Sequence, residues 1–90
     1  MDFICELNRV VLYNENKKIL AVVTFPDISF STVNINHTFV DDSLRGQGVA
    51  SKIMEKTAKT IRSQNKKAKL TCSYAISWFN KHPEYNDILE

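Results

Sequence analysis

The sequence has few glycines, prolines and cysteines and no long apolar run. There are two of each of these residues among the 90, and no stretch has the composition of a linker, a repeat or a low-complexity tract. No apolar run approaches the roughly 20 residues that a membrane helix needs, and the first residues lack a signal-peptide pattern. We therefore expect a cytoplasmic protein with no membrane partner, in which Cys5 and Cys72 are reduced thiols rather than a disulfide.

The length and composition are those of one small globular unit. The chain is 43% hydrophobic and 24% charged, which is ordinary for a globular protein. Ninety residues allow one modest core and leave little room for a separate substrate domain. The expectation is a single domain over residues 1–90.

The net charge of +2 hides an uneven distribution of basic residues. Seven of the twelve lie close together, with Glu55 as the one acid among them: Lys52, Lys56, Lys59, Arg62, Lys66, Lys67 and Lys69. They form either a solvated helix face or an electropositive rim that attracts a polyanionic cofactor. The aromatic residues are not interleaved with them, which argues against nucleic acid as a partner.

The first half of the chain has the pattern of β-strands. Arg9 to Tyr13 is rich in Val, Leu and Tyr and predicts a strand that extends backward toward Phe3, and Ile19 to Phe25 is nearly all apolar. Thr32 to Val40 alternates, which predicts a third strand. The residues expected on one face of that strand are Val33, Ile35, His37 and Phe39. Short turns between these strands indicate an antiparallel three-stranded meander.

The second half has the pattern of helices around one further strand. An apolar stripe of four-residue spacing predicts a long helix from Val49 to about Asn65. Ala68 to Cys72 predicts a fourth strand, which the helical crossover would make parallel to the sheet. Ser73 to Asn80 predicts a short helix capped by Ser73, and Tyr85 to Leu89 a last turn. The predicted class is therefore mixed α/β (α+β).

Both glycines lie at the junction between the third strand and the long helix, in Leu44-Arg45-Gly46-Gln47-Gly48-Val49-Ala50. Glycine allows backbone conformations closed to other residues and lets a ligand approach the main chain closely. A helix that begins there directs unpaired N–H groups and the positive end of its dipole into the same space. This pattern predicts an anion site, and a pyrophosphate is the favoured ligand.

Arg45, Gly48 and Ala50 fit the pattern [Q/R]-x-x-G-x-[G/A] between a strand and a long helix. The segment resembles motif A of the GNAT superfamily of acyl-CoA-dependent N-acetyltransferases. Cys72-Ser73-Tyr74 and the segment after it are similar to a GNAT subfamily of about this length with a Cys-Ser-Tyr signature. The resemblance covers roughly Arg9 to Leu89 and implies a truncated GNAT-like fold that binds acetyl-CoA.

The resemblance also implies which residues hold the cofactor. The loop backbone would bind the pyrophosphate, and the end of the third strand would run beside the pantetheine arm. The expected contacts are Thr38, Phe39, Val40, Arg45, Gly46, Gln47, Gly48, Val49 and Ala50. The acceptor would be an unidentified amine. Because the chain has no counterpart of the helices that form the acceptor site in larger relatives, a protein amine is one option.

Cys72 and His37 are the candidate catalytic residues. Cys72 precedes a predicted helix, whose dipole would lower the thiol pKa, and His37 has a side chain suited to base catalysis at neutral pH. In direct transfer His37 would deprotonate the amine. In a covalent route Cys72 would accept the acetyl group first, with His37 activating its thiol. Tyr74 and Tyr85 are candidate acids.

The usual catalytic assignment of the superfamily does not carry over to this chain. Many of its enzymes use a glutamate on the strand before the loop, and Thr32 to Val40 contains none. Both candidate residues also have structural explanations, as a hydrogen-bonded core histidine and a small buried thiol. A non-catalytic acyl-CoA-binding accessory or sensor module therefore stands as the alternative function.

Overall fold

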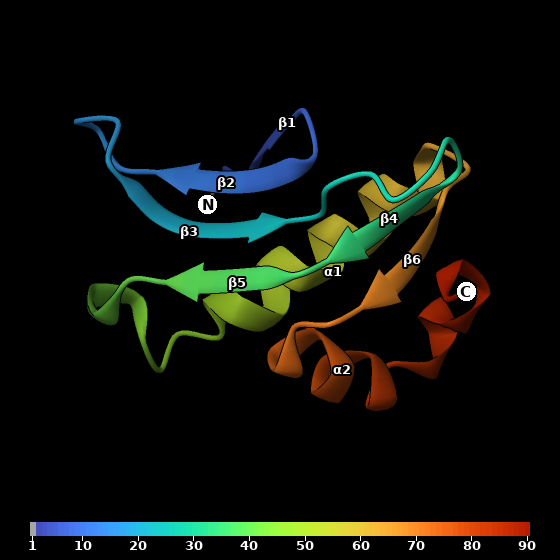
Figure 1. Ribbon diagram of the computed structural model, residues 1–90. Coiled ribbons are helices and arrows are strands. Elements are labelled where there is room, and N and C mark those ends of the chain that lie inside the picture. The colour runs from blue at the N-terminus through green and yellow to red at the C-terminus, as the bar shows by residue number, and fades with distance from the viewer. Residues whose placement is uncertain (1) are drawn as a thin grey trace.

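The computed structural model describes residues 2–90 and consists of a four-stranded and a two-stranded sheet, with the long helix behind the strands and the shorter helices at their ends (Figure 1). The elements in chain order are β1 (Ile4–Glu6), β2 (Arg9–Tyr13), β3 (Ile19–Thr24), β4 (Thr32–Ile35), β5 (His37–Val40), the 3₁₀ helix η1 (Asp42–Leu44), α1 (Val49–Ser63), β6 (Lys67–Leu70), α2 (Ser73–Asn80) and the 3₁₀ helix η2 (Pro83–Ile88). The mixed α/β class is confirmed. The bounds of β2 and α2 are those predicted.

Four strands form an antiparallel sheet in the order β1-β2-β3-β5. The predicted meander is present as β2, β3 and β5. The prediction that the first strand extends back toward Phe3 is wrong, because the chain turns between β1 and β2 and forms a separate edge strand. Asn8 makes this turn with a φ of 57°, a conformation that asparagine tolerates better than most residues.

The predicted strand from Thr32 to Val40 is two strands that break at Asn36. β4 pairs in parallel with β6, whereas β5 pairs antiparallel with β3. The Asn36 N–H donates to the Thr24 carbonyl at 3.2 Å, and this one residue lies outside both ladders. A residue outside the ladder shifts the alternation of side chains by one position.

This shift overturns the predicted face of β5. Val33 and Ile35 on β4 are fully buried, as expected, but His37 and Phe39 on β5 are exposed. Thr38 and Val40 point inward instead and are half-buried. The prediction that His37 shares an apolar face with Val33 and Ile35 is therefore wrong.

Helix α1 lies across one face of the sheet, and its buried residues lie along one side of the helix. Its buried residues are Val49, Ile53, Met54, Thr57, Ala58 and Ile61. They pack in one cluster with side chains of β2, β3 and β4, of which Val10, Val23 and Ile35 are fully buried. Because α1 is fixed to the sheet along its length, the position of its first turn is fixed as well.

The chain returns from α1 through β6, parallel to β4, and enters α2. The predicted strand from Ala68 to Cys72 begins and ends earlier than expected, at Lys67 and Leu70. Cys72 is the N-cap residue of α2 and has extended backbone angles. The prediction that Ser73 caps this helix is wrong, because Ser73 is its first helical residue. In the described residues, neither helix has the length and hydropathy to cross a bilayer.

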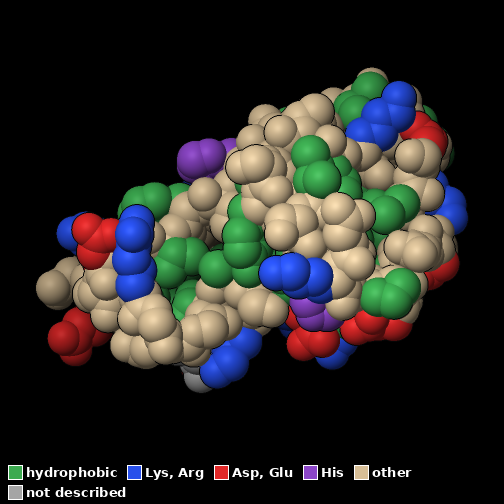
Figure 2. Space-filling model, turned by 90° about the horizontal axis from the view of Figure 1, so that it is seen from below, with side chains coloured by type: hydrophobic (Ala, Val, Ile, Leu, Met, Phe, Trp, Pro, Cys, Tyr) green, Lys and Arg blue, Asp and Glu red, His purple; other side chains and the backbone are tan. Residues whose placement is uncertain are grey.

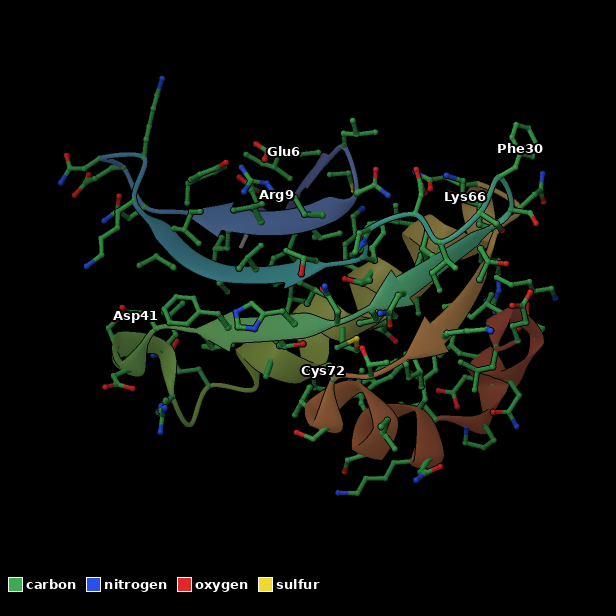
Figure 3. The ribbon with its side chains drawn as sticks, viewed as in Figure 1. Glu6, Arg9, Phe30, Asp41, Lys66 and Cys72 are labelled. Atoms are coloured by element: carbon green, nitrogen blue, oxygen red, sulfur yellow. The ribbon has the colours of Figure 1, made fainter. Side chains whose placement is uncertain are left out.

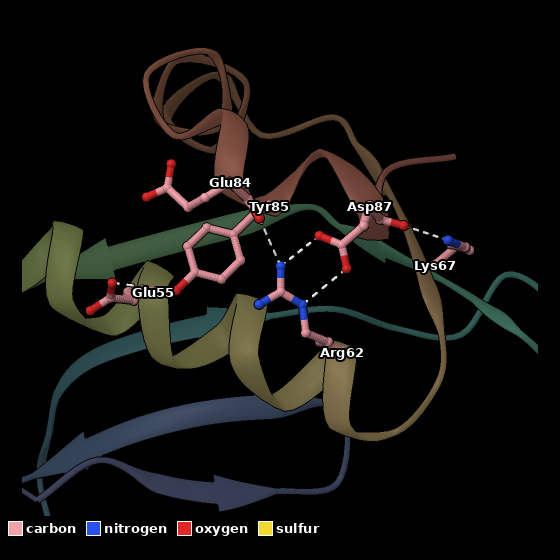
Figure 4. A network of polar contacts seen from close by, with 6 residues as sticks. All are labelled: Glu55, Arg62, Lys67, Glu84, Tyr85 and Asp87. Carbon is pink, nitrogen blue, oxygen red and sulfur yellow. Dashed lines mark hydrogen bonds and ion pairs between the residues drawn. The ribbon is translucent and has the colours of Figure 1, made fainter.

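Side-chain contacts from α2 and η2 hold the C-terminal segment against α1. The Trp78 indole N–H donates to the Ser51 hydroxyl at 2.9 Å. The Arg62 guanidinium binds both carboxylate oxygens of Asp87, at 3.0 and 2.5 Å (Figure 4), and lies over the Tyr85 ring. These contacts fix α2 and η2 relative to α1.

Candidate functional site

A gap separates β5 from the end of β6 and the start of α2. The β4–β6 pairing ends at Ile35 and Leu70, and the next two N–H groups, of Thr71 and Cys72, both donate to the Ile35 carbonyl. The chain beyond Ile35 turns away to pair with β3. The outer edge of β5 therefore has no neighbouring strand within residues 2–90.

The free edge of β5 presents backbone groups of Thr38 and Val40. In an antiparallel pair, opposite residues alternate between hydrogen-bonded and non-bonded pairs. The Asp41 N–H donates to the Leu20 carbonyl at 2.7 Å, and in the same register Phe39 opposite Val22 is a bonded pair. The N–H and C=O groups of Thr38 and Val40 consequently point away from β3 and into the gap.

The glycine loop closes one end of this gap. Gly46 and Gly48 have φ values of 81° and 72°, in the left-handed region that glycine adopts at little cost. A Cβ at either position would meet no atom within 4 Å. Their conformation, rather than crowding by the rest of the protein, is what calls for glycine, and the space beside them is open to a ligand.

The first turn of α1 leaves a set of unpaired donors at the same place. Gly48 is the N-cap residue and makes no side-chain cap, and the first backbone bond of the helix is from the Lys52 N–H to the Gly48 carbonyl. Among the described residues, the backbone N–H groups of Gly46, Gly48, Val49, Ala50 and Ser51 have no backbone acceptor. No acidic residue lies in this first turn, so the helix dipole is free to attract an anion.

These elements enclose a pocket of about 500 Å³. It is lined by Thr38, Val40, Leu44, Arg45, Gly46, Gly48, Val49, Ala50, Ser51 and Tyr74. The view from below shows hydrophobic side chains gathered in a hollow left of centre, with Lys or Arg side chains on either side (Figure 2). The lining contains no carboxylate, and its volume lies within the range of small-molecule sites.

The pocket contains most, but not all, of the predicted contact residues. Phe39 lies on the opposite face of β5, where 40% of it is exposed. Gln47 lies outside the lining and its side-chain amide donates to the Ser43 carbonyl at 3.4 Å. The structure adds Leu44 and Ser51, which sequence reasoning missed, since they belong to the segments on either side of the predicted set.

The loop before the pocket is held by its own acidic residues. The Asp41 carboxylate accepts hydrogen bonds from the Ser43 hydroxyl at 2.6 Å and the Ser43 N–H at 3.0 Å. Both bonds lower the pKa of Asp41, and the bond from the hydroxyl has the larger effect. Asp42 pairs with Arg45 at 2.8 Å, although both side chains are highly exposed, so this pair contributes little to stability.

Cys72 lies at the start of α2, just behind the pocket wall. Its sulfur faces β5 (Figure 3) and donates to the Thr38 hydroxyl at 3.5 Å. Burial raises the pKa of the Cys72 thiol. The thiolate form can accept hydrogen bonds from the Thr38 hydroxyl and from the N–H groups of Ala75, Tyr74 and Thr38, and these bonds together lower the pKa by more than burial raises it. The net pKa of Cys72 is therefore below its ordinary 9.0. Donors that stabilise the thiolate favour its nucleophilic form.

The structure does not bring His37 together with Cys72, and neither residue belongs to the pocket lining. His37 is adjacent to Thr38, and successive side chains of a strand point to opposite faces. Because the Thr38 hydroxyl contacts Cys72, the His37 imidazole lies on the other side of β5, where it is exposed.

The two candidate tyrosine acids differ in position. Tyr74 lines the pocket, and burial raises its pKa, so its hydroxyl stays protonated at neutral pH. Tyr85 is buried under Arg62, and its hydroxyl donates to Glu55 at 3.4 Å, away from the pocket. Both cysteines are free thiols. The described residues hold no group of three His, Cys, Asp or Glu side chains that could bind a metal.

Residues 9–88 match the family of GCN5-related N-acetyl-transferases. The chain is also 30% identical over 63 residues to Protein NATD1 of Xenopus tropicalis, a match that covers 70% of the chain and 58% of that protein. It therefore spans less than two thirds of the length of this curated relative.

Solved structures show the same fold. A GCN5-like protein from Staphylococcus aureus, solved by NMR, is 30% identical with a TM-score of 0.78, over 99% of this chain and 87% of that one. Tetrahymena GCN5 superimposes with a TM-score of 0.65 at 17% identity, over 81% of this chain and 48% of that one. Ard1 of Thermoplasma volcanium gives 0.64 at 21% identity, over 83% and 53%. The last two identities are too low to carry more than the fold.

Proposed function

The chain belongs to the GCN5-related N-acetyltransferase family, and on this basis we propose that it binds acetyl-CoA in the pocket beside β5 and transfers the acetyl group to an amine. The observation that carries the proposal is that the residues whose N–H groups lack a backbone acceptor line a pocket without carboxylates; they are Gly46, Gly48, Val49, Ala50 and Ser51. We further propose a cytoplasmic location, because the free thiols of Cys5 and Cys72 suit a reducing compartment.

The loop would hold the pyrophosphate. A phosphate oxygen gains a charge-assisted hydrogen bond from each backbone N–H that points to it, and the helix dipole adds roughly half a positive charge at the same place. The positive φ values of Gly46 and Gly48 expose these N–H groups on one side of the loop. Arg45 lines the pocket and would add a positive charge on exchanging its exposed partner Asp42 for a phosphate.

The free edge of β5 would hold the pantetheine arm. Thr38 and Val40 direct backbone donors and acceptors into the gap, and the two amides of the arm can pair with them as a neighbouring strand would. The apolar side chains of Val40, Leu44 and Val49 line the same space. This set of groups fits a long, flexible ligand with amide bonds and a charged end.

Acetyl-CoA supplies a reactive thioester to this site. In the covalent route the Cys72 thiolate would attack the acetyl carbonyl, and the CoA sulfur would take up a proton and leave as the thiol. A neutral amine would then attack the acetyl group on Cys72, which would leave as the thiolate, and the proton lost by the amine would restore the proton donor. Hydrogen bonds from Thr38 and from the first turn of α2 hold the thiolate. Tyr74 lines the pocket in its protonated form and is our candidate for the proton donor to the CoA sulfur.

In the direct route Cys72 takes no acetyl group, and the amine attacks the thioester itself. The base would then be His37, acting on an amine that approaches across the outer face of β5. His37 cannot contact Cys72 through the strand, so we do not retain its proposed role in activating the thiol.

A non-catalytic acyl-CoA-binding module is the second candidate. The observation in its favour is that the pocket lining contains no carboxylate and no histidine, so a base for the amine must come from outside the pocket. In such a module Thr38 and Cys72 would serve only to join β5 to α2.

Incubation with labelled acetyl-CoA followed by intact-mass measurement separates these functions. A Cys5→Ser background leaves Cys72 as the one thiol. A mass gain of one acetyl group that is lost in Cys72→Ala and discharged by an added amine supports the covalent enzyme. Transfer to an amine that persists in Cys72→Ala but fails in His37→Ala supports the direct route. Binding of acetyl-CoA with no transfer to any amine tried supports the module.

A further inference from the structure

Three lysines form a basic stripe along the exposed face of α1. Lys52, Lys56 and Lys59 are exposed and follow one another at spacings of four and three residues, which places them on one side of the helix. The stripe is about 10 Å long at the rise of an α-helix.

Three other basic residues of the same region form ion pairs with carboxylates. Arg62 is held by Asp87, Lys66 pairs with Asp27 at 3.2 Å and Lys69 with Glu90 at 3.8 Å. Lys67 donates to the Asp87 carbonyl (Figure 4). Within residues 2–90, Lys52, Lys56 and Lys59 form no ion pair. Among the described residues, the basic side chains of this region without an ion pair are therefore the three of the stripe and Lys67, which meets only an uncharged carbonyl.

The stripe borders a surface groove with an apolar side chain at its edge. The groove has a volume of about 410 Å³ and is lined by Phe3, Lys52, Glu55, Lys56 and Lys59. Phe3 is half-buried against the core. Glu55 accepts a hydrogen bond from the Tyr85 hydroxyl at 3.4 Å, so its charge is held toward η2. The groove thus offers three cations and one aromatic ring to a ligand.

We propose that this groove is a docking site for an acidic protein segment that carries an apolar residue among its carboxylates. Carboxylates of the segment would pair with the three lysines, and its apolar side chain would contact Phe3. Charge complementarity of this kind gives specificity and a fast on-rate. The two lysines at the far end of the stripe, Lys56 and Lys59, lie about 10 and 15 Å along α1 from Val49, so the docking site can be tested apart from acetyl-CoA binding.

The dimensions of the stripe favour a protein segment over nucleic acid. Three lysines over about 10 Å can neutralise few phosphates, whereas the affinity of nucleic-acid-binding proteins depends on many such contacts. Phe3 is one half-buried ring and does not form the succession of aromatic platforms on which bases stack.

A double substitution far from the glycine loop tests the docking site. The probe is a fluorescein-labelled peptide of glutamates with one central leucine, and the control peptide has glutamine in place of glutamate. We expect the acidic probe alone to bind, with amide shifts centred on Phe3 and α1. Lys56→Glu with Lys59→Glu should weaken it about tenfold or more, because two attractions become repulsions. The matched control Lys18→Glu with Lys81→Glu makes the same change of net charge elsewhere and should weaken it less than twofold.

Four results would overturn the proposal. They are no binding of the acidic peptide, equal weakening by the two double variants, shifts centred on the Arg45–Ala50 loop, or tighter binding of a double-stranded DNA oligonucleotide to the same stripe. Acetyl-CoA affinity is measured in parallel and should be unchanged in the Lys56→Glu, Lys59→Glu protein. Failure of acetyl-CoA to bind any of these proteins would count against the proposed function and not against the docking site.

Discussion

The Cys72 sulfur lies 3.5 Å from the Thr38 hydroxyl, although 34 residues separate them in the chain. This contact crosses the gap where β5 leaves β4 and β6, and it joins the free edge of β5 to the first turn of α2. It places a thiol with a lowered pKa directly beside the strand edge that we assign to the pantetheine arm.

The Thr38 hydroxyl should control the ionisation of Cys72. In Thr38→Val the thiolate loses one of its hydrogen-bond donors while the shape of the side chain is kept, so we expect the pKa of Cys72 to rise toward 9.0. The measurement is the pH dependence of iodoacetamide alkylation in a Cys5→Ser background. Thr60→Val, whose half-buried hydroxyl on α1 donates to the Lys56 carbonyl, is the matched control and should leave the profile unchanged. A profile that does not move in Thr38→Val would show that backbone donors alone set this pKa.

Gly48→Glu should abolish acetyl-CoA binding and leave the fold intact. A Cβ at Gly48 meets no protein atom within 4 Å, so the folded chain has room for it. The positive φ costs a non-glycine residue about 1–2 kcal/mol, and the carboxylate would repel the pyrophosphate. Gly48→Asn is the control for the backbone cost, because asparagine tolerates this conformation without adding charge. Calorimetric binding measures affinity and an amide spectrum checks the fold; wild-type affinity in Gly48→Glu would refute the loop as the pyrophosphate site.

Ser51→Ala should destabilise the protein through a buried donor. It removes the acceptor of the Trp78 indole N–H, in a residue that is only 4% exposed. A buried donor without a partner costs about 1–3 kcal/mol. The better helix propensity of alanine offsets part of this, about 0.5 kcal/mol. Urea unfolding without ligand measures the difference, and Ser63→Ala, with an exposed hydroxyl on the same helix, is the control. Equal stability of the two variants would mean that the Trp78 bond contributes nothing.

The ion pair between Arg62 and Asp87 predicts a pH dependence of stability. The hydrogen bond from Arg62 lowers the pKa of Asp87 below its ordinary 3.8. A carboxylate with a lowered pKa in the folded state stabilises the fold above its ordinary pKa, and this contribution is lost as the pH falls through the folded value. The melting temperature of Asp87→Asn should therefore lie below that of the wild type at pH 6 and approach it below pH 3. A difference in melting temperature that stays constant across this pH range would exclude the ion pair as its cause.

The elements that local pattern determines could be predicted from the sequence, and the exceptions have a common physical cause. β2, α1 and α2 follow from strand composition and from an apolar stripe of helical spacing. The break at Asn36 could not be predicted, because the alternating pattern of residues 32–40 continues through this residue without interruption. The break arises because β4 pairs with β6 whereas β5 pairs with β3. The positions of His37 and Phe39 depend on that break, and so both were expected on the wrong face.

The loop was the most predictable part of the site. Two glycines before a helical stripe already indicate positive φ values and an open helix N-terminus at Gly46 and Gly48. Tyr74 could be considered as an acid from its place after Cys72, but its position in the pocket depends on how α2 packs against α1. That packing involves the hydrogen bond between Trp78 and Ser51, which no local sequence pattern predicts.

An acetyl-CoA titration followed by amide chemical shifts tests the central claim most directly. If acetyl-CoA binds as proposed, the largest shifts occur in the Arg45–Ala50 loop, at Ser51 and along the free edge of β5 at Thr38 and Val40, with smaller ones at Cys72. CoA without the acetyl group should shift the loop to the same extent. Saturating acetyl-CoA that shifts no residue of this pocket, or shifts only residues elsewhere, would contradict the assignment of the site.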